Sequence, residues 1–254
     1  MKLIRFGIAL LLTTAVVHAQ NTFTIKTDNT ELGRCSYSFD KTKDGYKVSS
    51  HYQVRTSAQF QQRADRPTGD PRSGPSAVLV TDLEQTHTYK LDAAYTYAGG
   101  EIQSSNPRIT YSFKLNRGRT TMEIQGMQDG VQSMFSEIPL KPGYVVLPNY
   151  DASALQALLY IVAAHPQADG FYYLIVPGVA WAYRQMVQAR LGMAGDTSGT
   201  LDGKPVTLRH YNFAFGQSIY DVYADGANTL MEADVQGLQA SYIRNGFALD
   251  SARR

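Results

Sequence analysis

Four histidines that follow the apolar start of the chain are the first residues that could carry out acid–base or metal chemistry: His51, His87, His165 and His210. None lies in a spacing typical of a metal site relative to another histidine, a cysteine or a carboxylate. His51 falls on the polar phase of a strand pattern, and His165 ends a helix pattern, where a cation meets the negative end of the dipole. His87 and His210 are therefore the two candidates for a dispersed hydrolase site, which would need a nucleophile or a metal partner from another strand.

Nucleophile and cofactor motifs give no stronger prediction. The segment Gly195–Gly199 reads Gly-Asp-Thr-Ser-Gly, with serine in the fourth place instead of the third place of a nucleophile elbow. We interpret it as a hairpin loop. The sequence contains no glycine-rich phosphate loop and no dinucleotide fingerprint, so it predicts no catalytic residue, no metal ligand and no cofactor.

The first nineteen residues have the layout of a secretory signal peptide. Lys2 and Arg5 form a basic start, an apolar stretch runs from Ile8 to Val17, and Ala19 precedes the expected cleavage. This apolar stretch is too short for a spanning helix. We therefore expect a periplasmic or secreted protein that starts at Gln20 and keeps no spanning segment.

Charge narrows the range of partners. Loss of Lys2 and Arg5 lowers Lys+Arg from 24 to 22, equal to the 22 Asp+Glu, so the formal net charge falls from +2 to zero. A neutral surface argues against nucleic acid or an anionic membrane as the main partner.

Cys35 is the single cysteine, which excludes an intrachain disulfide. It alternates with polar neighbours along the strand pattern, which predicts that it is buried as a small apolar residue.

Alternation of apolar and polar residues dominates the rest of the chain. Turn-forming pairs separate the alternating segments about every ten residues, which is typical of antiparallel meanders, sandwiches and barrels. The predicted turns are Asp44-Gly45, Gly99-Gly100, Arg117-Gly118, Asp129-Gly130, Asp202-Gly203 and Asp225-Gly226. A longer strand is predicted from Trp181 to Met193.

One segment breaks this pattern. Residues 151–165 are helix formers throughout, with Asp151 or Ser153 able to cap the start, and Pro166 follows. The helix has little polar face, so it must be covered on nearly all sides. The prediction is a mainly β protein, with a curved antiparallel sheet or half-barrel and one apolar helix packed on its concave face.

The domain organisation follows from the same pass along the chain. Residues 57–76 carry three prolines and almost no apolar side chains, which indicates a mobile loop. Neither side of a weak boundary near Pro139–Gly143 has an obvious complete core of its own. We therefore expect a single β-rich domain over residues 20–254.

Aromatic residues are abundant, with 17 Tyr, 10 Phe and one Trp. Two explanations remain open: strand propensity with core packing, or the wall of a cavity for an amphipathic ligand. Under the second explanation, strand aromatics and the apolar stripe of the helix would line the ligand site. Its predicted residues are Tyr95, Tyr97, Tyr111, Phe113, Leu155, Leu158, Leu159, Val162, Trp181 and Tyr183.

The two ends of the exported chain resemble a known family. The segments 23–26, 31–39, 219–226, 230–232 and 242–244 are similar in style to exported bacterial proteins of the family called domain of unknown function 3108. The resemblance implies a curved antiparallel sheet and a periplasmic location. A weaker architectural analogy links it to periplasmic lipoprotein carriers, whose half-barrel with a helical lid holds acyl chains; fold analogy transfers no site residues.

The sequence thus leads to three hypotheses about function. The first is noncatalytic binding of a lipid-like or other apolar ligand. The second is a structural or protein-interaction module of the cell envelope, using its sheet surface or the 57–76 segment. The third is the hydrolase with a dispersed site near His87 or His210.

Overall fold

The computed structural model describes residues 20–27, 30–55, 82–107, 109–148, 151–177, 185–216, 218–236 and 240–250. The expected signal peptide, the 57–76 loop, Trp181 and Tyr183 lie outside the described residues. Strands make up 69% of the structure, and they form a single large sheet that curls without closing. The predicted fold class is therefore confirmed.

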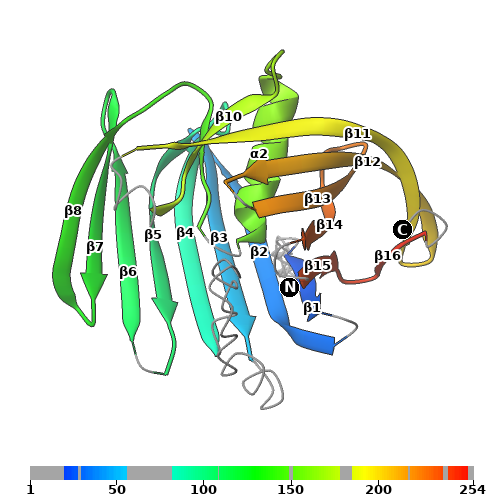
Figure 1. Ribbon diagram of the computed structural model, residues 1–254, viewed down its shortest axis with the longest axis horizontal. Helices are drawn as coiled ribbons and strands as arrows, with labels where there is room; N and C mark the ends of the chain where they lie inside the picture. The colour runs from blue at the N-terminus through cyan, green and yellow to red at the C-terminus, as the bar shows by residue number, and fades with distance from the viewer. Residues whose placement is uncertain are drawn as a thin grey trace, which may run out of the picture.

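The first half of the sheet is an antiparallel meander (Figure 1). Its strands are β1 (Asn21–Thr27), β2 (Thr30–Thr42), β3 (Gly45–Val54), β4 (Leu83–Asp92), β5 (Tyr97–Ser105), β6 (Thr110–Arg117), β7 (Thr121–Gln128) and β8 (Val131–Pro139). Buried and exposed residues alternate along β4, as the sequence predicts, with Gln85, His87, Tyr89 and Leu91 facing inward. β8 forms one outer edge of the sheet.

The second half starts at the opposite edge and returns to the centre. It comprises β9 (Tyr144–Val146), α2 (Ala152–Ala164), β10 (Phe171–Ile175), β11 (Val187–Leu201), β12 (Lys204–Phe215), β13 (Ser218–Asp225), β14 (Leu230–Val235), β15 (Ala240–Arg244) and β16 (Phe247–Leu249). β15 pairs antiparallel with β1 and joins the two halves, while β16 pairs with β11. β9 and β10 are parallel, and α2 is the crossover between them.

The helix occupies the interior of the curl. Figure 1 shows β2–β8 running roughly vertically and β11–β13 roughly horizontally, with α2 between them. Asp151 caps the helix by accepting a hydrogen bond from the Ser153 backbone N–H, and every residue from Ala152 to Leu159 is buried. The main core cluster joins α2 to both halves of the sheet, and Cys35 is buried in it as expected.

Two local predictions were wrong. Gly99-Gly100 lies inside β5 instead of in a turn, because Gly99, with φ of +148°, is used at a register shift between β4 and β5. Gly195–Gly199 is not a hairpin loop, since β11 continues through it to Leu201. Of the strand predicted from Trp181 to Met193, the part from Val187 onward is present in β11, which continues to Leu201, and residues 185 and 186 lie before it.

Candidate ligand-binding groove

A buried polar network fixes the start of α2 against the sheet. Asp151 Oδ1 accepts hydrogen bonds from Ser50 Oγ at 2.9 Å, the Ser153 backbone N–H at 2.9 Å and Ser153 Oγ at 2.7 Å. Asp151 Oδ2 lies 2.6 Å from His87 Nδ1, and neither side chain is exposed to solvent. Four partners thus satisfy a carboxylate that would otherwise be costly to bury.

The other side of the imidazole is packed against tyrosines. His87 Nε2 lies 3.3 Å from the Tyr97 hydroxyl, and the ring stacks on Tyr89 with centroids 4.1 Å apart. The Tyr89 hydroxyl donates to Ser153 Oγ at 3.0 Å, which closes the network back onto the helix. Side chains from β4, β5 and α2 therefore hold one another in place.

Burial and charge act in opposite directions on Asp151. Burial raises the pKa of its carboxyl group, but the hydrogen bond and charge of His87, with hydrogen bonds from Ser153 and Ser50, lower it more, so the net shift of this pKa is downward. Burial also raises the pKa of Tyr89 and Tyr97 well above the usual value. Asp151 is therefore ionised at neutral pH, and the two tyrosine hydroxyls keep their protons.

This network lacks the order of a hydrolase site. Ser153 Oγ donates to the carboxylate of Asp151, whereas His87 contacts Asp151 and Tyr97. A serine nucleophile would need the imidazole itself as its base. The network instead fixes the start of α2 to the sheet through Asp151 and Ser153.

His210 lies in a different environment. Its Nε2 is 2.8 Å from Asp221 Oδ1, and its ring stacks on Tyr223 at 4.6 Å. In the described ranges, no group of three or more His, Cys, Asp or Glu side chains is placed to hold a metal ion. Among the described residues, each of the two candidate histidines thus contacts an aspartate and stacks on a tyrosine.

A groove opens on the inner face where β4, β5 and β6 meet the ends of β9 and β10. Its volume is about 250 Å³, and its lining is Gln85, Ile102, Ser104, Tyr111, Phe113, Pro148, Val176 and Pro177. Sheet register sets one wall, because Gln85, Ser104 and Tyr111 are direct neighbours across three strands, as are Ile102 and Phe113. Ser104 Oγ donates to Gln85 Oε1 at 3.0 Å, so the mainly apolar lining includes two polar side chains.

The opposite wall comes from the parallel strand pair. The Leu147 backbone N–H donates to the Ile175 carbonyl at 2.9 Å, so the chain segments leaving β9 and β10 run together. Pro148 follows the first strand, and Val176 and Pro177 follow the second. These three residues face the aromatic wall across the groove.

The structure separates the predicted site residues into groups. Tyr111 and Phe113 line the groove. Tyr97, Leu155, Leu158 and Leu159 are buried in the core.

Tyr95 and Val162 belong to neither group, since both are partly buried against the core. Tyr95 stacks on Tyr46 at 4.9 Å. A hollow between α2 and the tyrosines of β4 and β5 has no room for a water molecule, so Ala157 and Ile161 of the helix act there as packing. The groove residues that the sequence did not predict are Gln85, Ile102, Ser104, Pro148, Val176 and Pro177.

The fold defines an all-β protein built on one open, curled sheet around a buried helix. No family model matches the chain, and no match was found among curated proteins or solved structures. Within the described ranges, no helix is long and apolar enough to cross a membrane.

Proposed function

We propose that this chain is a noncatalytic binding protein for a lipid-like or other small apolar ligand, held in the groove beside Tyr111 and Phe113. The observation that carries the proposal is an open groove with a mainly apolar lining that also includes the polar side chains Gln85 and Ser104. Small-molecule sites commonly combine an apolar lining with a few placed polar groups.

The size of the groove limits the ligand. Its volume of about 250 Å³ is slightly below the usual range of roughly 300–1,000 Å³ for small-molecule sites. A compact apolar molecule, or one end of an acyl chain, fits this volume.

We propose a periplasmic or secreted location, supported by the signal-like start of the sequence. N-terminal sequencing of the exported protein tests this location, and the sequence should begin at Gln20.

Native mass spectrometry of protein purified without detergent tests whether a ligand copurifies with the chain. A reproducible added mass that organic solvent extracts as lipid is expected.

Titration with N-phenyl-1-naphthylamine, a neutral fluorescent probe, tests the location of the site, and we expect saturation at one probe per chain. Phe113→Ser should weaken probe binding, whereas Ser112→Ala, on the opposite face of β6, should leave it unchanged. Equal binding by the two variants would contradict the groove assignment.

A second function is favoured by the outer edge of the sheet. β8 is an edge strand, and Val131 and Phe135 on it are 69% and 51% exposed. Long edge strands with exposed apolar residues can pair with an extended segment of another protein. A clean apo mass together with a cross-linked envelope protein at β8 would favour this interaction module over the ligand carrier.

A further inference from the structure

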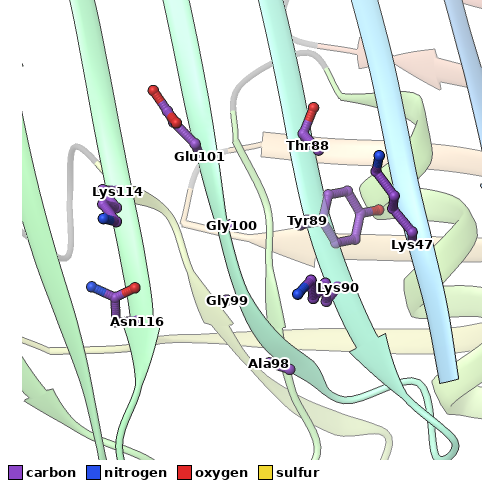
Figure 2. A pocket seen from close by; sticks show the side chains of 10 residues that line it. All are labelled: Lys47, Thr88, Tyr89, Lys90, Ala98, Gly99, Gly100, Glu101, Lys114 and Asn116. Carbon is purple, nitrogen blue, oxygen red and sulfur yellow. The ribbon is translucent and has the colours of Figure 1, made fainter. Parts of the chain in front are cut away.

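The outer face of β3–β6 carries a hollow of about 430 Å³, on the opposite side of the sheet from the apolar groove. Figure 2 shows the side chains around it. The lining residues are Lys47, Thr88, Tyr89, Lys90, Ala98, Gly99, Gly100, Glu101, Lys114 and Asn116.

Glycines in β5 create the hollow. Gly99 is the register partner of Lys90 on one side and Asn116 on the other, so no side chain fills the outer face between them. Ala98 is the extra residue at the register shift, which marks a β-bulge. Gly100 faces the interior, where an added Cβ would lie 2.5 Å from Tyr89 Cβ. The floor of the hollow is therefore bare backbone.

Lysines surround this floor. Lys47 and Lys90 are directly opposite each other across β3 and β4, an arrangement that destabilises a sheet when both residues carry the same charge. Lys114 approaches from β6, on the other side of the glycines (Figure 2). Among the residues that the structure describes, no carboxylate lies within 4.0 Å of any of these three ammonium groups.

The nearby carboxylates do not neutralise the site. Glu101 is the register partner of Lys114, but its Oε1 accepts a hydrogen bond from Gln103 Nε2 at 2.9 Å, and Figure 2 shows its carboxylate pointing away from Gly99. Asp40 is opposite Lys47 on the side of β2, away from the hollow. The lining of the hollow thus holds three lysines and one carboxylate, while Asp40 and Glu123 lie one strand further out, beside Lys47 and Asn116.

We propose that this hollow binds a phosphate-type oxyanion, carried by a small molecule or by a lipid headgroup. Lys47 and Lys90 neutralise it together, Lys114 contacts it from the far side, and the Asn116 amide is a further donor. A multiply charged anion removes the repulsion between the two opposed lysines, and ammonium groups are effective phosphate ligands. The open glycine floor lets the anion approach the backbone closely.

Isothermal titration of the exported chain with inorganic pyrophosphate at low salt tests the site. We expect saturable binding, weakened at least tenfold by Lys90→Gln and by Lys47→Gln and largely kept by Lys90→Arg. Lys204→Gln, at an exposed lysine at the start of β12, is the matched control and should bind as the unmodified chain does. Circular dichroism checks that each variant is folded.

Thermal unfolding without pyrophosphate gives an independent readout. Lys90→Gln removes the like-charge pair, so its Tm should rise by up to about 3 °C while its affinity falls. A fall of affinity through misfolding would instead be accompanied by a lower Tm.

Vesicle sedimentation separates the two sources of the anion. Retention on phosphatidylcholine vesicles containing phosphatidic acid, lost in Lys90→Gln, would assign a lipid headgroup. Pyrophosphate binding without retention would assign a soluble phosphate compound. Binding to neither probe, or binding that persists in both lysine-to-glutamine variants, overturns the proposal and leaves the apolar groove unaffected.

Discussion

His87 Nδ1 lies 2.6 Å from Asp151 Oδ2, in a position where both side chains are excluded from solvent. This contact joins the middle of β4 to the capping residue of α2. The carboxylate also lies at the positive end of the helix dipole, which favours its charged form. This hydrogen-bonded pair ties the start of the helix to β4.

Asp151→Asn should strongly destabilise the protein. The substitution keeps the size of the side chain but removes the charge that His87, Ser50 and Ser153 surround. Loss of hydrogen bonds to a buried charged group costs about 1.5–3 kcal/mol. Urea unfolding should show this loss, and Ser50→Ala, which removes one neutral donor, should cost only about 1 kcal/mol. Similar values for the two variants would contradict the dominant role of the His87 contact.

The pKa of Asp151 predicts instability in acid. The unfolded carboxyl group takes up a proton near pH 3.8, whereas the folded one does so at lower pH because its pKa is lowered. The unfolded state therefore binds more protons in this window, so the free energy of unfolding contributed by Asp151 is present above pH 3.8 and decreases as pH falls below it. Urea titrations at pH 3–6 measure this slope, which should be shallower in Asp151→Asn.

Gly100→Ala should be destabilising although alanine is a small residue. The added Cβ would lie 2.5 Å from Tyr89 Cβ, 2.5 Å from the Tyr97 hydroxyl oxygen and 2.6 Å from the Thr88 carbonyl oxygen. Overpacking of this kind costs about 1–3 kcal/mol. Gly192→Ala is the matched control, because an added Cβ there meets nothing within 4 Å. A melting temperature equal to that of the control would show that β4 and β5 can move apart.

Leu158→Ala tests whether the helix leucines act as core. Leu158 is 2% exposed and belongs to the cluster that joins both halves of the sheet. Truncation should cost about 2–5 kcal/mol, while Val162→Ala, at the half-buried end of the same helix, should cost less. Probe binding in the groove should persist in both folded variants. Loss of probe binding in Leu158→Ala alone would show that the helix contributes to the ligand site.

Local patterns were sufficient for most of the fold but not for every turn. Aspartate–glycine pairs predicted the turns after β7 and β11, where Asp129 and Asp202 adopt positive φ. The turn between β4 and β5 needs no glycine, because Asp92 Oδ1 accepts hydrogen bonds from two backbone N–H groups and Tyr95 adopts a φ of 61°. Of the nearby glycine pair, Gly99 lies at the register shift and Gly100 continues the regular pairing of β5 with β4.

The sequence predicted two of the eight residues that line the groove. Tyr111 and Phe113 belong to one phase of a recognisable strand, which made them candidates. The wall formed by Pro148, Val176 and Pro177 depends on parallel pairing between β9 and β10, a long-range arrangement that no local periodicity specifies. The buried anchor of Asp151 depends likewise on a histidine 64 residues away.

The pairing of β1 with β15 has a kinetic consequence. Thr24 and Asn245, joined across this seam, are 221 residues apart, whereas the neighbouring hairpins of each half are made from adjacent segments. Hairpins can form as soon as both of their strands are available, but β1 has β2 as its sole partner in the sheet until β15 arrives. Because closing so long a loop carries the largest entropic cost, formation of this seam should limit the folding rate, and β1 should stay open to strand exchange until then.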